Sequence, residues 1–148
     1  MQGKRSSRLK KELIDLETYK DVFSVEVDKN DSRIWRISFK GAEKTLYEGE
    51  NFTLQFKFPN EYPIESPEVI FVGHIPTHEH IYSNGFICLS ILYNEWSPAL
   101  RVSSVCLSIL SMLSSATVKK KPVGDAEFSA RKFSGPKQVR WYFDDDTV

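Results

Sequence analysis

The sequence predicts one α+β domain in which helices pack on one face of a four-stranded antiparallel sheet. An amphipathic helix at the start of the chain, followed by four strand-like runs in meander order, supports this fold class. A second amphipathic helix follows an irregular middle segment. The 148 residues are enough for one compact domain with a single hydrophobic core.

The first predicted helix covers residues 7–20. Apolar residues recur there at helical spacing and form one stripe. They are Leu9, Leu13, Ile14 and Leu16. Ser6 or Ser7 is the expected cap, because a serine oxygen accepts a hydrogen bond from a free amide at a helix start. The basic residues near this start indicate a solvated helix face.

Four strands are predicted after this helix. The first three runs alternate between apolar and polar residues, as half-buried antiparallel strands do. Turn residues, Asn30-Asp31 and Gly49-Glu50-Asn51, separate the runs. The predicted strands cover residues 23–27, 34–39, 52–58 and 68–72.

Two segments lack regular periodicity. Residues 59–67 contain three prolines, whose fixed φ angles predict an ordered loop. Residues 73–96 are apolar but aperiodic, and long irregular segments in compact domains are often functional. We therefore expect the functional site in the second segment.

A second helix is predicted to begin at Ser103. Its apolar residues recur every three or four positions and form one side. They are Val105, Cys106, Ile109, Leu110, Met112 and Leu113.

From Lys119 onward, prolines and glycines interrupt any long helix. A short helix is expected over residues 125–133, with Asp125 as its cap. The end of the chain is aromatic and then acidic, and we interpret it as loosely held. The domain thus divides into a core, residues 1–118, and a divergent, partly flexible tail, residues 119–148.

Composition argues against several functional classes. Twenty basic residues balance 20 acidic ones, which gives no support for nucleic-acid binding as the main task. No apolar run is long enough to cross a bilayer, and no secretory signal is present. The two cysteines lack the spacing of a disulfide framework. We therefore expect no nucleic-acid or membrane partner, and a reducing compartment, the cytoplasm or the nucleus.

Cys88 is the strongest candidate for a functional residue. It follows an Asn-Gly turn, and His78 and His80 lie ten and eight residues before it. A thiol near turn residues and imidazoles is a candidate nucleophile. Cys106 instead lies on the apolar stripe of the second helix, where a thiol is usually an inert packing residue.

A metal site is one alternative, because His74, His78, His80 and Cys88 are all of ligand type. Their spacing matches no zinc finger or ribbon, and no second cysteine is near. We therefore expect no metal. A histidine such as His78 commonly holds a tight loop by hydrogen bonds to backbone groups.

The segment around Cys88 resembles the active-site signature of ubiquitin-conjugating enzymes. In that family, a His-Pro-Asn triplet begins ten residues before the nucleophilic cysteine, Asn-Gly lies just before the cysteine, and Trp-Ser-Pro-Ala follows it. The matching residues are Asn84-Gly85, Ile87-Cys88-Leu89 and Trp96-Ser97-Pro98-Ala99, together with Leu46-Tyr47-Glu48-Gly49, Tyr62-Pro63 and Pro67. The resemblance extends from the first helix to about Leu113. Glu79 and His80 depart from the triplet.

Within this family the chain is most similar to the W-type. That type also has His at the position of His80 and Ser at the position of Ser90. Its chain ends in Asp-Asp-Thr-x, as here in Asp145-Asp146-Thr147-Val148. It keeps the proline of the triplet where this chain has Glu79, so the rigidity of the turn differs.

The resemblance implies the ubiquitin-conjugating fold: an N-terminal helix, the four-stranded meander, an active-site loop and a central helix. It also implies a carrier reaction. An activating enzyme, which consumes ATP, hands ubiquitin to Cys88 as a thioester, and a substrate amine then attacks with the help of a RING or U-box ligase. No metal or cofactor would be bound.

The resemblance also assigns roles to individual residues. His80 would stabilise the tetrahedral oxyanion or accept the proton of the amine, while His78 supports the loop and Asn84 the turn. The expected ligase-binding residues are Arg8, Lys11, Pro63, Ile64, Ser97, Pro98 and Ala99.

The residues that would surround the incoming amine favour an N-terminal α-amine. Typical family members have acidic residues there, which help a lysine lose its proton. This chain has Lys119 and Lys120, and Ser90 is neutral; a basic rim disfavours an ammonium group. An α-amine has a pKa of about 7.7 to 8.0, against about 10.4 for lysine. The W-type is similar in being known for attaching ubiquitin to protein N-termini, so substrates with accessible N-termini are expected.

Three alternatives remain. They are an ordinary lysine-directed conjugating enzyme, a non-catalytic ubiquitin-binding variant of the fold, and a cysteine hydrolase that uses Cys88 and His80. Non-catalytic variants lack the cysteine, which argues against the second. No Gly-rich oxyanion element or third orienting group is identifiable for a hydrolase.

Overall fold

The computed structural model describes residues 2–142, with side chains from Arg5 onward. Its sheet has the strand order β1-β2-β3-β4, and each strand pairs antiparallel with the next. The predicted meander is therefore confirmed. The strands are β1 (Ser24–Val27), β2 (Ile34–Lys40), β3 (Asn51–Lys57) and β4 (Glu68–Val72).

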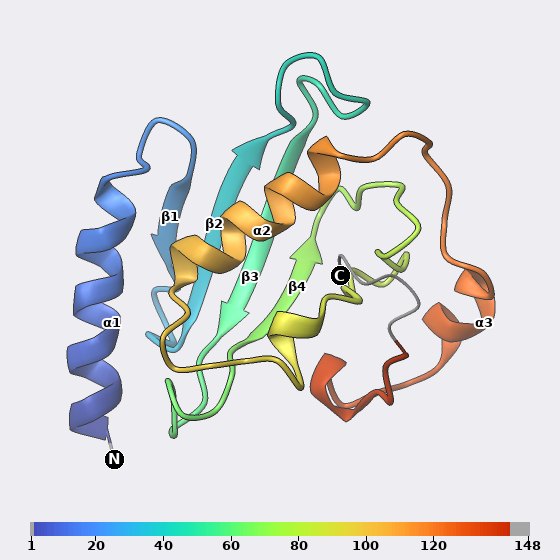
Figure 1. Ribbon diagram of the computed structural model, residues 1–148. Helices are drawn as coiled ribbons and strands as arrows, with labels where there is room; N and C mark the ends of the chain where they lie inside the picture. Colours follow the sequence, from blue (N-terminus) through green and yellow to red (C-terminus); the bar gives the residue numbers. More distant parts are fainter. Residues whose placement is uncertain (1, 143–148) are drawn as a thin grey trace.

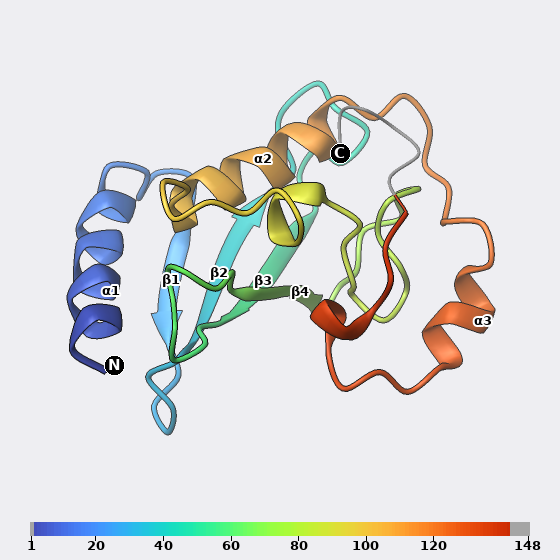
Figure 2. The same ribbon diagram turned by 60° about the horizontal axis from the view of Figure 1, so that its bottom comes forward.

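The helices surround this sheet on one face and at its two ends. In Figure 1, α2 crosses one face of the sheet, α1 lies beside β1, and α3 lies beyond β4. Figure 2 shows the same arrangement, with the last described residues running back past the loop that follows β4. The helices are α1 (Gln2–Glu17), α2 (Val102–Ser114) and α3 (Asp125–Ala130), with short 3₁₀ turns η1 (Ser90–Leu92) and η2 (Pro136–Gln138).

The core lies between α2 and the sheet. The strand register places Ile37 opposite Leu54, and Leu54 opposite Phe71, so one apolar row crosses three strands. These side chains are almost wholly buried. The predicted apolar side of α2 covers them, with Val105 and Ile109 fully buried. Alternation in the strands and helical periodicity in α2 thus meet in one core.

Two acidic residues of α1 bind the start of α2. Glu12, 2% exposed, accepts hydrogen bonds from the Val102 amide at 3.2 Å and from the Tyr62 hydroxyl. Asp15 accepts a hydrogen bond from the Ser103 hydroxyl at 2.5 Å. The first amides of a helix have no partner within it and carry partial positive charge, so carboxylates stabilise this end. The contact fixes α1 against α2.

Several predicted boundaries are wrong. α1 begins at Gln2 and ends at Glu17, so Ser6 and Ser7 lie within the helix and do not cap it. α3 ends at Ala130, and its N-cap is Gly124, because the Asp125 carboxylate binds Ser83 instead.

The C-terminal segment packs more closely than the sequence predicts. As far as Tyr142 it lies against the loop after β4, and Trp141 stacks on Tyr93 with ring centres 5.2 Å apart. Residues 143–148, which include the acidic end, lie outside the described residues. These contacts belong to the described part of the tail, and its expected looseness stays a prediction.

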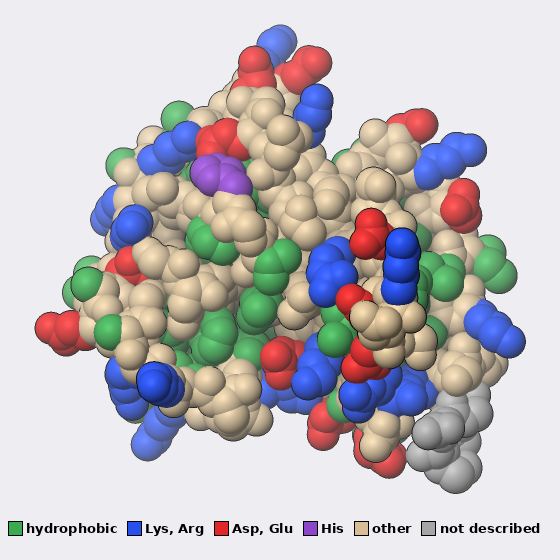
Figure 3. Space-filling view, turned by 180° about the vertical axis from the view of Figure 1, so that it is seen from behind, with side chains coloured by type: hydrophobic (Ala, Val, Ile, Leu, Met, Phe, Trp, Pro, Cys, Tyr) green, Lys and Arg blue, Asp and Glu red, His purple; other side chains and the backbone are tan. Residues whose placement is uncertain are grey.

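The face behind the sheet carries charges of both signs. Figure 3 shows acidic and basic side chains interspersed around a hollow where hydrophobic side chains gather. Such a mixed surface agrees with the balanced net charge of the chain. Among the described residues, no helix is both long and apolar enough to cross a membrane.

Gly85 offers a test of how tightly the active-site loop joins the sheet. Its φ is +91°, and an added Cβ would lie 2.1 Å from the Phe71 carbonyl oxygen. Because the clash is with backbone, we expect Gly85→Ala to lower the free energy of unfolding by about 3 kcal/mol or more. Gly73→Ala, at φ +75° in open space, is the matched control and should cost only about 1 kcal/mol. Urea titration measures both, and equal losses would contradict the expectation.

Candidate active site

The loop after β4 contains a tight hairpin that carries Cys88. The Cys88 amide donates to the His80 carbonyl at 2.8 Å, and the Tyr82 amide donates to the Phe86 carbonyl at 2.9 Å. Ile81 and Ile87 form an antiparallel bridge between these pairs. In such a ladder, directly opposite residues project from the same face with Cβ atoms about 5 Å apart. Cys88 and His80 are therefore neighbours across the hairpin.

The hairpin is anchored on both of its faces and at its turn. Ile81 and Ile87, 1% and 0% exposed, point into the core. The Phe71 amide of β4 donates to the Gly85 carbonyl at 2.9 Å, which joins the hairpin to the sheet. Asn84, the predicted turn residue, accepts the Phe86 amide at 3.0 Å with its side-chain oxygen.

The Cys88 thiol faces the C-terminal segment and is 7% exposed. Its Sγ donates to the Tyr142 carbonyl, with Sγ and O 3.6 Å apart. Together with Tyr82, Phe128 and Trp141, these residues line a cavity of about 550 Å³. The Trp141 indole N–H donates to the Pro136 carbonyl at 2.9 Å and holds the segment over the thiol.

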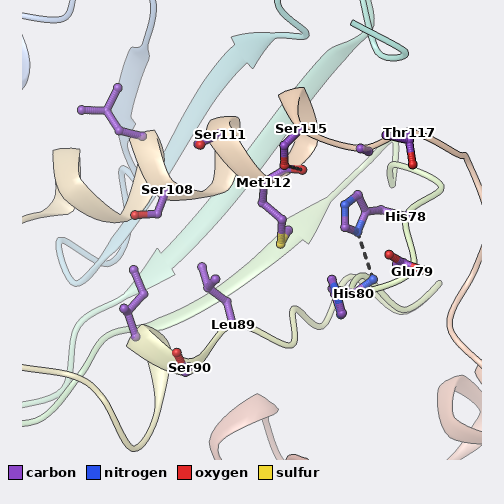
Figure 4. Close-up of a pocket in the computed structure, with 13 residues that line it drawn as sticks. His78, Glu79, His80, Leu89, Ser90, Ser108, Ser111, Met112, Ser115 and Thr117 are labelled. Carbon is purple, nitrogen blue, oxygen red and sulfur yellow. Dashed lines mark hydrogen bonds between the residues drawn. The ribbon is translucent and has the colours of Figure 1, made fainter. Parts of the chain in front are cut away.

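His78 and His80 line a groove of about 620 Å³ between the hairpin and α2 (Figure 4). The His78 ring lies between Met112 and the backbone of His80, whose amide donates to His78 Nδ1 at 2.9 Å. Burial, and then the charge of His80, lower the pKa of His78. The His78 ring is therefore neutral at pH 7, and its role as loop support agrees with this geometry.

The two cysteines occupy opposite environments. Cys106 is fully buried in α2, and burial raises the pKa of its thiol. A thiol that rarely ionises and meets no solvent is inert. Cys88 instead lines a cavity, on a hairpin in which it lies directly opposite His80.

The predicted basic rim is held by acidic partners. Lys119 Nζ lies 2.7 Å from Glu50 Oε2 and 5.0 Å from the centre of the Tyr47 ring. Lys120 Nζ lies 3.6 Å from the carboxylate of Glu79. Burial acts to raise the pKa of Glu50, but hydrogen bonds from His74 and Lys119 outweigh it, so its pKa is lowered. The expected positive rim is thus locally neutralised, which corrects the electrostatic picture drawn from the sequence.

Ser90 begins the η1 turn and lines the same groove as His80. It contributes a hydroxyl where typical family members have a carboxylate. The wall of the groove formed by α2 is also rich in hydroxyls, from Ser108, Ser111 and Ser115. The groove is therefore polar but carries little charge.

Four of the expected ligase-binding residues, Arg8, Lys11, Pro98 and Ala99, line one cavity. Ile64 is 74% exposed, and Ser97, Pro98 and Ala99 are exposed beside Lys11. Pro63 is half-buried, and its carbonyl accepts the Trp96 indole N–H at 2.8 Å. Arg8 has partners within the chain.

The Arg8 guanidinium donates to the Leu100 carbonyl at 2.7 Å and pairs with Glu12 at 3.4 Å. It is therefore part of the junction between α1 and α2, and its expected ligase contact stays a prediction.

No group of three His, Cys, Asp or Glu side chains in the described part of the chain is arranged to hold a metal ion. His74 Nε2 lies 2.8 Å from Glu50, whereas His78 and His80 interact with each other. These imidazoles thus have separate partners.

Two further residues contact the hairpin, which the sequence analysis did not predict. Asp125 was interpreted as a helix cap, and Trp141 as part of a loose tail. Both act through contacts with the hairpin, 42 residues away for the Asp125–Ser83 pair. The only signals were an aspartate after a glycine and a run of aromatic residues, and neither specifies a partner.

The chain matches a known protein family over most of its length. A family model described as "Ubiquitin-conjugating enzyme" matches residues 8–133. The chain is 54% identical to the Dictyostelium discoideum protein "Probable ubiquitin-conjugating enzyme E2 W" over the whole of both chains. It is 58% identical to the Caenorhabditis elegans "Ubiquitin-conjugating enzyme E2 W", over 80% of this chain and 79% of the relative.

Among solved structures, the crystal structure of ubiquitin conjugating enzyme E2 UbcA1 from Agrocybe aegerita is similar, with a TM-score of 0.80 and 38% identity. The similarity covers 88% of this chain and 96% of that one. The family match ends at residue 133, so the segment that closes over Cys88 lies beyond it.

The contacts of Trp141 lead to a prediction about access to the thiol. Aromatic pairs contribute about 0.5 to 1.5 kcal/mol each, and every 1.4 kcal/mol is a factor of ten in an equilibrium. We expect Trp141→Ala to speed alkylation of Cys88 by iodoacetamide about tenfold, measured by mass spectrometry of the Cys88 peptide. Tyr142→Ala keeps the covering carbonyl and the indole, and is the matched control. Unchanged alkylation in Trp141→Ala would show that the segment does not shield the thiol.

Proposed function

This chain belongs to the ubiquitin-conjugating enzyme family, in its W-type branch, and we propose that Cys88 is the residue that carries ubiquitin. The observation that carries the proposal is the hairpin, which places Cys88, the cysteine of the family signature, directly opposite His80. The sulfur attacks the carbonyl carbon of the thioester on the activating enzyme. A new C–S bond forms as the old one breaks, and the departing sulfur of the activating enzyme takes up the proton that Cys88 loses. A thiolate is both a good nucleophile and a good leaving group, so Cys88 can also release the acyl group.

The groove between the hairpin and α2 suits the C-terminal end of ubiquitin. It begins at His80 and at Leu89, which follows Cys88, and its walls are polar and rich in hydroxyls. An extended peptide there would direct its last carbonyl toward the thiol. His80 then either donates to the oxyanion of the tetrahedral intermediate or accepts the amine proton.

The acceptor proposed is the N-terminal α-amine of a protein. Among the residues that line the cavity over Cys88, none is acidic, and Arg131 and Arg140 contribute positive charge. In the groove on the other side, the acidic residue is Glu79, which is paired with Lys120. Neither cavity, in the described part of the chain, offers an unpaired carboxylate that would draw a lysine proton. An α-amine needs such a carboxylate less, because its lower pKa gives it a far larger neutral fraction than lysine near pH 7.

Ubiquitin, an activating enzyme and a ligase are the partners of this family. We assign the ligase to the RING or U-box class, because exposed apolar loop residues beside a basic helix suit a small docking patch. Ile64 and Pro98 lie in that patch. The enzyme needs no bound cofactor, since the upstream activating enzyme spends the ATP. Its proposed location is the cytoplasm or the nucleus, without nucleic-acid or membrane contact.

The thioester is tested by incubation with ubiquitin, ATP and activating enzyme. We expect Cys88→Ala to abolish the reductant-sensitive adduct, because Cys88 supplies the acyl acceptor. Cys106→Ala should retain it, at the cost of about 1 kcal/mol of stability for a small core cavity. An adduct that survives in Cys88→Ala would refute the assignment. Binding of ubiquitin without an adduct would favour a non-catalytic module, and turnover of an acyl substrate would favour a hydrolase.

The acceptor is tested by discharge of the loaded enzyme onto a peptide with a free or an acetylated N-terminus, both containing lysine. We expect the free peptide to react and the acetylated one to be inert near pH 7. The preference should narrow as the pH rises toward the lysine pKa of about 10.4. His80→Ala should slow discharge about 100-fold. Equal rates for the two peptides would identify an ordinary lysine-directed enzyme.

A further inference from the structure

We propose that Asp125 is a positioning residue, which holds the tip of the hairpin in the place that ubiquitin transfer requires. Its Oδ1 accepts the Ser83 amide at 2.7 Å, and its Oδ2 accepts the Ser83 hydroxyl at 2.5 Å. Ser83 is in the turn that connects the arm of His80 to the arm of Cys88. One carboxylate of α3 thus binds the turn through two hydrogen bonds.

The setting of Asp125 suits this role. The residue is only 9% exposed, although aspartate is rarely buried. Its carboxylate is not used as a helix cap, because the N-cap is Gly124, without a side-chain hydrogen bond. Burial acts to raise its pKa, but the hydrogen bonds from Ser83 outweigh this effect and its pKa is lowered. The group is therefore charged at neutral pH, and hydrogen bonds to a charged acceptor are the stronger kind.

A second contact of α3 reinforces the first. The Phe128 ring stacks on Tyr82 with ring centres 3.8 Å apart. Tyr82 and Ser83 are adjacent in the turn, so α3 contacts the tip of the hairpin through both residues. A helix of six residues is not stable by itself, which means that these contacts order α3 as well as the hairpin.

Release of the turn would displace the reacting groups of His80 and Cys88 as well as the tip of the hairpin. The core fixes the hairpin at Ile81 and Ile87, and β4 holds Gly85 through the Phe71 amide, while Ser83 at the tip of the turn is held by Asp125 of α3. If the turn is released, its motion reaches His80 and Cys88 through the ladder of backbone hydrogen bonds. A misplacement of about 1 Å at a reacting centre can cost up to about 100-fold in rate.

The experiment uses the full chain, loaded with ubiquitin, in single-turnover discharge onto a peptide with a free α-amine at varied concentration. Asp125→Ala should lower the saturating rate about tenfold and leave the half-saturating concentration unchanged. Asp125→Asn should restore the rate to within about threefold, because the amide oxygen can accept the Ser83 amide and its NH₂ can donate to the Ser83 hydroxyl. Amide chemical shifts of Asp125→Ala should change at His80, Gly85 and Cys88.

Ser129→Ala is the matched control. Ser129 also donates to Asp125 Oδ1, at 3.1 Å, but this hydrogen bond lies within α3 and does not join α3 to the hairpin. It should discharge at the wild-type rate. A loss in Ser129→Ala equal to that in Asp125→Ala would attribute the effect to α3 stability and overturn the proposal. A wild-type rate in Asp125→Ala, or an equal loss in Asp125→Asn, would overturn it too.

If Asp125→Ala does not fold, Ser83→Ala decides. It removes one of the two hydrogen bonds at an exposed side chain and should slow discharge about threefold, whereas an unchanged rate overturns the proposal. The inference rests on the proposed role of Cys88 as the acyl carrier, and the location of the adduct distinguishes failure of that role from failure of the role of Asp125. Loss of the Cys88 assignment would show as an adduct on another residue in every variant, while loss of the Asp125 role leaves the adduct on Cys88.

Discussion

The hydrogen bond between the Cys88 amide and the His80 carbonyl joins the two arms of the hairpin, and the geometry of the site follows from it. Its register is fixed by Ile81 and Ile87, which fill the core between the two arms. A slip by one residue would move both isoleucines toward solvent, at a cost of about 1.5 to 3 kcal/mol for each side chain. The same hydrophobic burial that folds the domain therefore places Cys88 opposite His80 in the hairpin.

The hairpin must be rigid without the proline that the family signature has at the position of Glu79. Proline stiffens a loop by restricting the unfolded chain. The Glu79–Lys120 ion pair does not replace that effect, because both side chains are well exposed and such pairs contribute little. Rigidity here comes from buried groups, namely His78, which accepts the His80 amide, and Asp125, which binds Ser83. In this chain, contacts between side chains and distant segments therefore supply the rigidity that one proline supplies in the family signature.

The sequence predicted the elements with strong periodicity, and it singled out Cys88 as the candidate nucleophile. The strands and α2 alternate or repeat over many residues, and the surroundings of Cys88 match a spacing that a family shares. It did not predict pairings between side chains far apart in the chain. From the sequence alone, Lys119 is expected to be an unpaired positive charge. In the fold it pairs with Glu50, 69 residues away. The predicted ends of α1 and the predicted role of Asp125 as a helix cap were wrong for the same reason, because tertiary contacts override local preference.

The covered thiol reconciles protection with access. In the proposed reaction, Cys88 meets an activating enzyme and an acceptor in turn, yet only 7% of the residue is exposed. The segment that covers it is held by the ring contacts of Trp141 and one indole hydrogen bond. Each aromatic pair contributes about 0.5 to 1.5 kcal/mol, while ordering one residue costs about 1 to 2 kcal/mol of backbone entropy. The two terms nearly cancel over a few residues, so the closed segment can open at small cost. A partner that binds the exposed thiol needs only a modest affinity to displace it, and stray electrophiles meet a mostly closed site.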